Sequence, residues 1–396
     1  MRGRSLAVAY VATATVFSAQ LVLAPVLPSL TRTLLLTEFQ AGLFVTVSSA
    51  ALMVVSPLWG RVVTRFGARR VATLSMVGIA VCQLAFAGLA QVALADGRSA
   101  ATFPLLLACR ALGQGVAAAA TSVAVISYLS QNTAAGAERV RALGMFGAAL
   151  GLGTVLGPAL GSFLASQSLL WALYVPALPV AVVAVVVWRW LGDGHGVASA
   201  GERGALRAVQ VWPYLALGVV LFTVLAPVPL LLGFLVQDRF HLSAEAGASG
   251  AGLALVAYGL VSLVVQAFVV RWLAWPPMRL VRVGVPISLV AFVGIAVAPN
   301  LAVVVLATGL FGLGHGLAIP GYTAAPTFAV ASDQQGRLAG FLTSANGAGS
   351  ILGPLLATPL YGISPAVPLL ANAALMALLL VFVGLSSGNW QRSHTG

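Results

Sequence analysis

The sequence predicts an all-α membrane protein whose chain crosses a bilayer about twelve times. Of its 396 residues, 60% are hydrophobic and only 7% are charged, whereas an ordinary soluble domain is about 25% charged. The mean hydropathy is +1.03, and charge-free stretches of about 20 residues recur, each long enough to cross a hydrocarbon core of about 30 Å as a helix. Isolated strands cannot cross, because lipid offers their backbone groups no partners. A water-soluble protein is therefore excluded.

Twelve apolar runs, bounded by Arg, Pro, Gly and acidic residues, mark the expected helices. The first six are 5–29, 39–59, 71–93, 103–129, 142–166 and 169–190, and the second six are 212–236, 248–270, 281–298, 301–328, 338–362 and 367–387. The first run also resembles a secretory signal peptide, but eleven similar segments follow it, which favours a spanning helix. The polar segment 191–211 separates the two sets. We therefore expect an N-terminal six-helix bundle (1–190), a cytoplasmic linker (191–211) and a C-terminal six-helix bundle (212–396).

The charges of the chain indicate how it lies in the membrane. The net charge is +12, every basic residue is an Arg, and all of them except Arg110 lie in or near short loops. The surplus is therefore better explained by membrane topology than by nucleic-acid binding. If the N-terminus is cytoplasmic, three arginines lie outside (Arg32, Arg98 and Arg239), Arg110 lies in the membrane, and the other sixteen lie inside. Cytoplasmic loops are enriched in Arg and Lys. Both termini are therefore expected in the cytoplasm of a bacterial inner-membrane protein, next to anionic lipid head groups. The sixteen are Arg2, Arg4, Arg61, Arg65, Arg69, Arg70, Arg139, Arg141, Arg189, Arg203, Arg207, Arg271, Arg279, Arg282, Arg337 and Arg392.

The two halves of the sequence repeat one another. Residues 40–61 align without gaps on 250–271, which pairs the second helix with the eighth. Residues 151–158 align on 347–354 in the fifth and eleventh helices, and Gly113-Gln114-Gly115 aligns on Gly314-His315-Gly316 in the fourth and tenth. Homologous halves related by an axis along the membrane normal are typical of transporters.

Three motifs are distinctive. The first comprises Gly60, Arg61, Thr64, Arg65, Gly67, Arg69 and Arg70, and it resembles the cytoplasmic gating loop of the major facilitator superfamily. The likeness to this superfamily covers essentially the whole chain. The second is Arg110 followed by a Gly-rich turn in the fourth helix. The third is Gly153-x-x-x-Gly157-Pro158-x-x-Gly161 in the fifth helix, which resembles the motif of the drug/proton antiporters, an exporting branch.

The chain also departs from those patterns. Thr64 stands where the gating loop usually has an acidic residue, and Ser162 stands where the helix 5 motif usually has a second Gly. All eight acidic residues are expected outside the helices, including Glu38, Asp238 and Glu245. Proton-coupled relatives often use a carboxylate in the membrane, so the resemblance implies proton coupling but leaves its site to another residue.

Polar residues in the apolar runs are the candidates for a solute path. Arg110 is the one charge expected in the hydrocarbon region, where it costs about 2.5–3.5 kcal/mol on insertion scales. Gln114 and Thr121 follow at i+4 and i+11, so a regular helix places all three on one face. The alternative is an Arg that only bonds neighbouring carbonyls and fixes helix packing. Further cavity candidates are Gln20, Tyr258, Gln266, His315, Tyr322 and Asn346, although for each residue taken singly helix-to-helix hydrogen bonding is the favoured role.

His315 is the candidate for proton coupling, with Arg110 as a second group. The unperturbed pKa of His is near 6.5, so its charge changes between pH 5 and 8. The alternatives are a neutral imidazole that hydrogen-bonds Tyr322, a backbone carbonyl or the solute, and transport driven without protons.

These observations favour a secondary transporter over an enzyme or a sensor. Cys82 and Cys109 lie in apolar runs, so neither a disulfide framework nor a thiolate metal site is expected, and no cofactor is implied. The chain shows neither clustered catalytic side chains in its helices nor an added sensor domain. The resemblance implies a monomer that exports a small molecule, and a cavity without carboxylates suits a neutral or anionic amphipathic solute. The alternative is an uptake permease or a uniporter for a metabolite or a sugar.

The arginine distribution makes a testable prediction about topology. Single cysteines replacing Ser199 and Ser243 should respond differently to a membrane-impermeant thiol reagent added to intact cells, with only the second becoming labelled. The parent chain, which carries Cys82 and Cys109 alone, gives the background. Strong labelling at position 199 would contradict a cytoplasmic linker.

Overall fold

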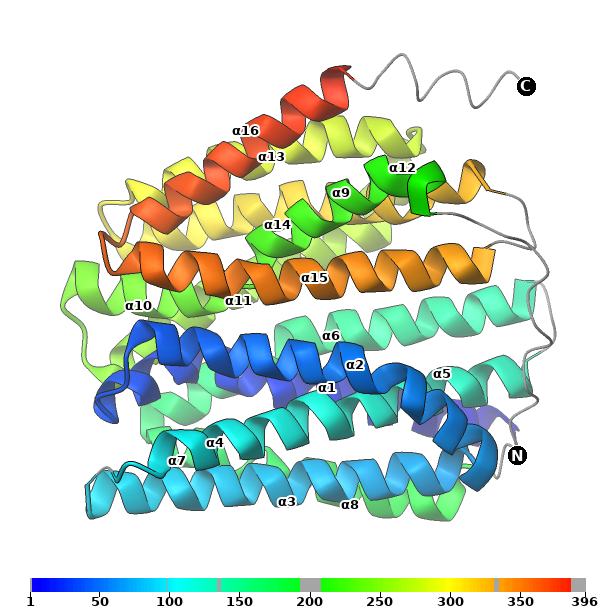
Figure 1. The fold of residues 1–396 in the computed structure, drawn as a ribbon, viewed down its shortest axis with the longest axis horizontal. Coiled ribbons are helices and arrows are strands. Elements are labelled where there is room, and N and C mark those ends of the chain that lie inside the picture. Colours follow the sequence, from blue (N-terminus) through cyan, green and yellow to red (C-terminus); the bar gives the residue numbers. More distant parts are fainter. Residues whose placement is uncertain (1, 98, 134–136, 193–207, 331–334, 386–396) are drawn as a thin grey trace. The chain divides into compact units, whose positions relative to one another are not determined.

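The computed structural model describes residues 2–97, 99–133, 137–192, 208–330 and 335–385, and these residues form helices joined by short turns, with no strand among them (Figure 1). The first half contains α1 (Arg2–Thr33), α2 (Glu38–Phe66), α3 (Ala68–Ala95), α4 (Thr102–Arg110), the π-helix η1 (Ala111–Ala117), α5 (Ala118–Asn132), α6 (Ala137–Gln167), α7 (Leu169–Tyr174) and α8 (Ala177–Trp190). Because α4, η1 and α5 are continuous and only a short turn parts α7 from α8, they make six spans.

The second half contains α9 (Ala208–Leu225), α10 (Val228–Phe240), α11 (Ala244–Val264), the π-helix η2 (Val265–Val269), α12 (Val270–Leu273), α13 (Pro277–Ala296), α14 (Leu301–Ala324), the 3₁₀-helix η3 (Ala325–Phe328), α15 (Gln335–Tyr361) and α16 (Val367–Leu385). Within the described residues, eleven helical spans are long and apolar enough to cross a membrane. The 27-residue helix α15 completes the set of twelve. The predicted fold class is confirmed.

Several helices extend beyond their expected ends. The second helix was expected to end at residue 59, but α2 continues to Phe66 and α3 begins at Ala68. The predicted gating loop is therefore mostly helical, and Gly67 alone separates the two helices. Gly67 has a φ of 84°, a conformation that glycine adopts without the steric cost of a Cβ atom. The helices continue because residues 60–66 contain no further helix breaker after Gly60.

The expectation that no acidic residue lies within a helix is wrong. Glu38 and Glu245 lie in the first turns of α2 and α11, where a negative charge interacts favourably with the helix dipole. Asp238 lies in the last turn of α10, because that helix continues to Phe240. Its Oδ2 accepts a hydrogen bond from the Tyr361 hydroxyl at 2.6 Å.

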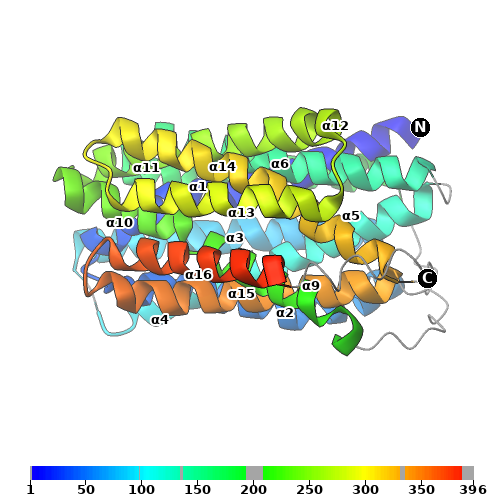
Figure 2. The same cartoon turned by 90° about the horizontal axis from the view of Figure 1, so that it is seen from above.

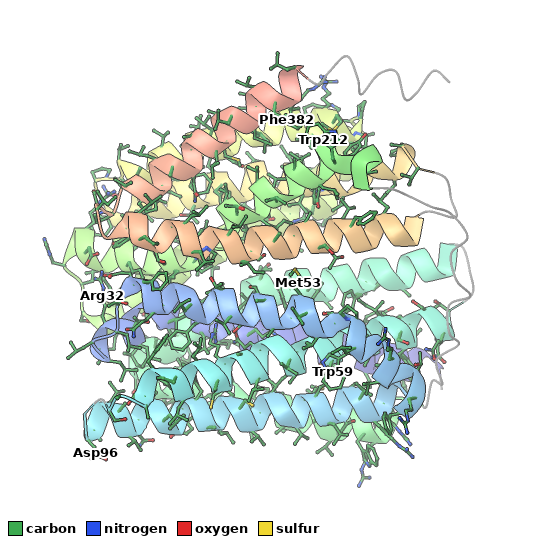
Figure 3. All side chains as sticks on the ribbon, viewed as in Figure 1. Arg32, Met53, Trp59, Asp96, Trp212 and Phe382 are labelled. Carbon is green, nitrogen blue, oxygen red and sulfur yellow. The ribbon has the colours of Figure 1, made fainter. Side chains whose placement is uncertain are left out.

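Two compact units make up the chain. Unit 1 comprises residues 1–198 and 241–252, and unit 2 comprises residues 199–240 and 253–396. The start of α11 clusters with unit 1, where the Ser249 hydroxyl donates a hydrogen bond to the Ser162 carbonyl (3.3 Å). Large apolar side chains are exposed along the helices, including Leu74 (71%) and Trp272 (84%). Such exposure suits a surface that contacts lipid. Figure 3 shows the exposed Trp212 side chain beside the half-buried Phe382.

Each unit contains a close helix contact that is made through glycine. In unit 1, α6 runs along α1 (Figures 1 and 2), and a Cβ atom at Gly157 would lie 2.5 Å from Leu21 Cβ and 2.8 Å from the Ser18 carbonyl oxygen. In unit 2, α15 packs on α9, and a Cβ atom at Gly353 would collide with the Thr223 carbonyl oxygen. Small residues let helix backbones approach in lipid. The aligned motifs of the two halves thus make the same contact in each unit.

A second pair of glycines fixes the fourth and tenth helices. A Cβ atom at Gly113 would lie 2.8 Å from Cys82 Cβ on α3, and one at Gly115 would lie 2.6 Å from Ala51 Cβ on α2. The aligned pair in α14 makes corresponding contacts, with α13 at Gly314 and with α11 at Gly316. The residues between these glycines, Gln114 and His315, therefore hold matching positions in the two units.

The glycine contact predicts the effect of one added methyl group. Gly157→Ala should lower the free energy of unfolding by about 1–3 kcal/mol, the usual cost of overpacking, because the new Cβ would press on the α1 backbone. Gly147→Ala is the matched control on the same helix, since nothing lies within 4 Å of its Cβ position. Thermal unfolding of the purified proteins in detergent provides the measurement, and equal melting temperatures for the two variants would contradict this account of the packing.

Candidate functional site

The most unusual side chain of unit 1 is Arg110, the last residue of α4. It is 8% exposed, and its Nε and Nη1 atoms have no hydrogen-bond partner among the residues that the structure describes. Most buried polar atoms in proteins are paired, and a buried charge without a partner is expensive. Two guanidinium donor atoms thus lie inside a spanning segment, and no described residue supplies an acceptor for them.

Arg110 lines a narrow pocket of about 10 Å³, which is room for about one water molecule. Two glutamines of this pocket bond backbone carbonyls: Gln114 Nε2 donates to Gln20 O (3.2 Å), and Gln83 Nε2 donates to Leu173 O (2.9 Å). The pocket lies within unit 1, among α1, α3, the α4–η1 segment and α8. Its lining residues are Ala19, Gln20, Leu23, Ile79, Cys82, Gln83, Phe86, Cys109, Arg110, Gly113, Gln114, Pro176, Ala177 and Val180.

The π-helix η1 changes the helix face that the sequence predicts. Residues 111–117 follow the i→i+5 pattern of a π-helix, so the residues beyond it are rotated relative to a regular α-helix. Gln114 still lines the pocket with Arg110, but Thr121 does not. The Thr121 hydroxyl lies 2.7 Å from the Ser75 hydroxyl, at 1% exposure, and so links α5 to α3. Sequence reasoning also missed Gln83, whose one signal is an amide within an apolar run.

His315 forms the corresponding site of unit 2. Its Nδ1 lies 2.9 Å from the Tyr258 hydroxyl on α11, and the Phe311 ring packs against both side chains. The imidazole is 6% exposed, and its Nε2 has no hydrogen-bond partner within the described part of the chain. The partner of His315 is therefore Tyr258 rather than Tyr322, and one ring nitrogen remains available.

The other candidates of unit 2 lie apart from this pair. The buried Tyr322 hydroxyl donates a hydrogen bond to Asn346 Oδ1 (2.7 Å) and so joins α14 to α15. Gln266 is exposed on η2 and donates to the Ser262 hydroxyl (2.9 Å). These contacts match the helix-to-helix and local hydrogen bonding expected of polar groups in spanning helices.

The residues of the predicted gating loop lie at the end of α2 and the start of α3, and the glycine motif lies where α6 contacts α1. Arg61, Thr64 and Arg65 are exposed on the last turns of α2, after Gly60, and Arg70 is exposed at the start of α3. The Arg69 guanidinium lies 5.2 Å from the Trp188 ring centroid. Gly153, Gly157, Pro158 and Gly161 belong to the face of α6 that packs on α1 or to its immediate neighbourhood.

The comparison with known proteins identifies the family. A sequence profile of the Major Facilitator Superfamily matches residues 6–354. The chain belongs to this superfamily. It is 28% identical over 353 residues to the class B tetracycline resistance protein of Escherichia coli, covering 85% of this chain and 83% of that protein. It is 31% identical over 359 residues to the class G protein of Vibrio anguillarum, covering 85% of both.

Solved structures share the fold. A bacterial homologue of the human lysosomal transporter Spinster, in an inward-facing, unoccupied conformation, gives a TM-score of 0.74 at 17% identity over 99% of this chain and 98% of that chain. As a major facilitator protein, the chain is a membrane transporter for a small molecule and not an enzyme.

Because its guanidinium is buried without a described partner, we predict that Arg110 lowers the stability of the folded protein. Arg110→Met, which keeps much of the side-chain length without the charge, should leave the melting temperature unchanged or raise it, as replacement of buried charges often does. Arg239→Met is the matched control, because Arg239 donates hydrogen bonds to the carbonyls of Ile295, Ala296 and Ala298 (3.1, 2.8 and 3.2 Å) and its loss should lower the melting temperature. Destabilisation by Arg110→Met as large as that by Arg239→Met would show that Arg110 serves packing.

Proposed function

We propose that this transporter exports a small neutral or anionic amphipathic compound by alternating access, and that protons drive the export. The single observation that carries the proposal is Arg110, whose Nε and Nη1 donors are buried in a spanning segment and find no partner among the described residues. Buried unmatched charge is tolerated mainly where function requires it, because intramembrane ionisable residues are rare and costly. The solute supplies what the protein lacks, an acceptor for these donors.

The geometry of the pocket supports one kind of contact with the solute. An Arg side chain presents parallel N–H donors that match a carboxylate or another oxyanion. Ligand pockets for drug-sized molecules measure about 300–1,000 Å³, far more than the roughly 10 Å³ beside Arg110. Arg110 therefore receives one polar group of the solute, while the remainder of the molecule is bound elsewhere or after the pocket widens during alternating access.

The relatives support the direction of transport. Two proteins that align with 85% of this chain are named for resistance to tetracycline, and a membrane transporter protects a cell from a drug by moving it outward. The glycine motif of α6, which resembles that of the exporting branch, packs α6 on α1 here. Tetracycline, which carries several ionisable oxygens, is accordingly the first probe to use.

The proposal predicts lower cellular accumulation of the solute. A drug-susceptible bacterial host expressing the chain should accumulate less tetracycline, or less of whichever antibiotic, dye or sugar gives the largest stability shift with the purified protein. Arg110→Ala should restore accumulation to the vector level while the variant remains folded in the membrane. Higher accumulation on expression would instead identify an uptake permease, and undiminished export by Arg110→Ala would remove Arg110 from the solute path.

The proton site we propose is His315, paired with Tyr258. An imidazole can bind a proton on the nitrogen that its neighbour does not occupy, and the free Nε2 of His315 is such an atom. The Tyr258 hydroxyl, 2.9 Å from Nδ1, can donate to that nitrogen in the neutral imidazole or accept from it in the protonated one. The pair can thus stabilise both protonation states, which a site that loads and releases a proton in each cycle requires.

Proton coupling through His315 predicts a selective loss of pH response. In liposomes, solute flux through the wild type should increase with an imposed pH gradient, whereas His315→Gln should still move solute down its own gradient but ignore the pH gradient. His241→Asn is the matched control, because it removes an exposed imidazole from the turn between α10 and α11. An intact pH response in His315→Gln would end the hypothesis, and so would equal loss in both variants.

A further inference from the structure

One end of unit 1 gathers arginine and tryptophan side chains. The Ser5 hydroxyl donates a hydrogen bond to the Trp190 carbonyl (2.8 Å), so the start of α1, with Arg4, lies beside the end of α8, with Arg189. Arg69 stacks on Trp188, which brings the start of α3 to the same end. The last turns of α2, with Arg61 and Arg65, join it through Gly67 (Figure 1). No acidic side chain is described at this end, so it presents a positive surface.

A groove of about 370 Å³ lies near this end, between α2, α3 and η1. Trp59 and Phe66 line it from α2, Arg70 and Leu74 from α3, and Val116 from η1. Phe66 and Leu74, which are 50% and 71% exposed, lie at its rim. The groove is therefore open at the helix surface, unlike the narrow pocket beside Arg110.

The polar groups in the groove wall are already satisfied, with one exception. The Trp59 indole N–H donates to the Val116 carbonyl (2.9 Å), and Figure 3 shows Trp59 on the side of α2 that faces η1. The Ser75 hydroxyl is paired with Thr121. Arg70 is exposed and forms no ion pair with any described residue. The groove thus offers a hydrocarbon surface with a single cationic group at one edge.

We propose that this groove binds an anionic phospholipid, with one acyl chain against the apolar wall and the phosphate at Arg70. An occupant must be apolar along its length, because the wall has no spare donor or acceptor, and anionic at one end. A phospholipid of the adjoining leaflet has this chemistry, and the surrounding arginines raise the local concentration of anionic lipids through their field. The groove would thereby hold the α2–α3 junction against the membrane.

Photocrosslinking of the purified full chain tests the proposal. Phosphatidylglycerol with a photoactivatable acyl chain should label residues 59–75, and unlabelled phosphatidylglycerol should compete at least five-fold better than phosphatidylcholine. Arg70→Gln should weaken the competition by phosphatidylglycerol about five-fold, the effect of one arginine near a membrane surface, and leave that by phosphatidylcholine unchanged. Arg70→Lys should retain most of the affinity, and thermal unfolding confirms that each variant is folded.

Arg65→Gln is the matched control. It removes an exposed arginine from the same end of unit 1, but one that stacks on Phe66 and does not line the groove. It should change the competition by less than two-fold. Three results would overturn the proposal: equal labelling by the two lipids, equal losses in Arg65→Gln and Arg70→Gln, or displacement of the lipid by tetracycline, which would assign the groove to the solute.

Discussion

Direct contact between helix backbones, made possible by glycine, is the constraint on which the rest of this structure depends. Apolar side chains gain little by leaving lipid, so spanning helices associate through packing and hydrogen bonds. Gly157 brings α6 against α1, and Gly353 brings α15 against α9. The glycines on either side of Gln114 and His315 likewise hold η1 and α14 against their neighbours. The same contacts that hold each unit together therefore also fix the positions of its central polar side chains.

Within that frame, buried polar groups fall into two kinds. The first kind forms hydrogen bonds to neighbouring helices and so connects elements, as Arg239, Thr121 and Tyr322 do. Arg110 and His315 leave ring or guanidinium nitrogens without partners in equally buried surroundings. A protein that keeps such groups gives up stability at those positions, which is a recurrent property of functional sites. This distinction, rather than residue type, is the reason that we propose functional roles for Arg110 and His315.

The number and order of the helices could be predicted from the sequence because a bilayer leaves few options. An apolar run of about 20 residues must become a helix, and the repeated glycine motifs show which helices correspond. The helix ends could not be predicted, because Arg61 and Arg65 continue α2 beyond its apolar part, where hydropathy gives no signal. Asp238 was misplaced for the same reason, since α10 continues past its apolar run to Phe240.

The candidate sites were predictable in their residues but not in their partnerships. The alignment of the two halves pointed to His315 as the counterpart of Gln114, yet the contact of His315 with Tyr258 depends on how α11 packs against α14. In the fourth helix, a shared face for Arg110, Gln114 and Thr121 assumed a constant 3.6 residues per turn. The glycines of residues 111–117 gave no sign that they would adopt the π geometry.

The π segment sets the relative rotation of the two ends of the fourth span. Each residue turns an α-helix by about 100° about its axis. An extra residue in one turn therefore changes the angle about this axis between the residues before the π segment and the residues after it. If residues 111–117 returned to α geometry, Arg110 would rotate by about that angle relative to Thr121, which Ser75 ties to α3. A change in local winding alone could thus aim or withdraw the guanidinium, while the ends of the span stayed at the same depth in the bilayer to within about one residue's rise.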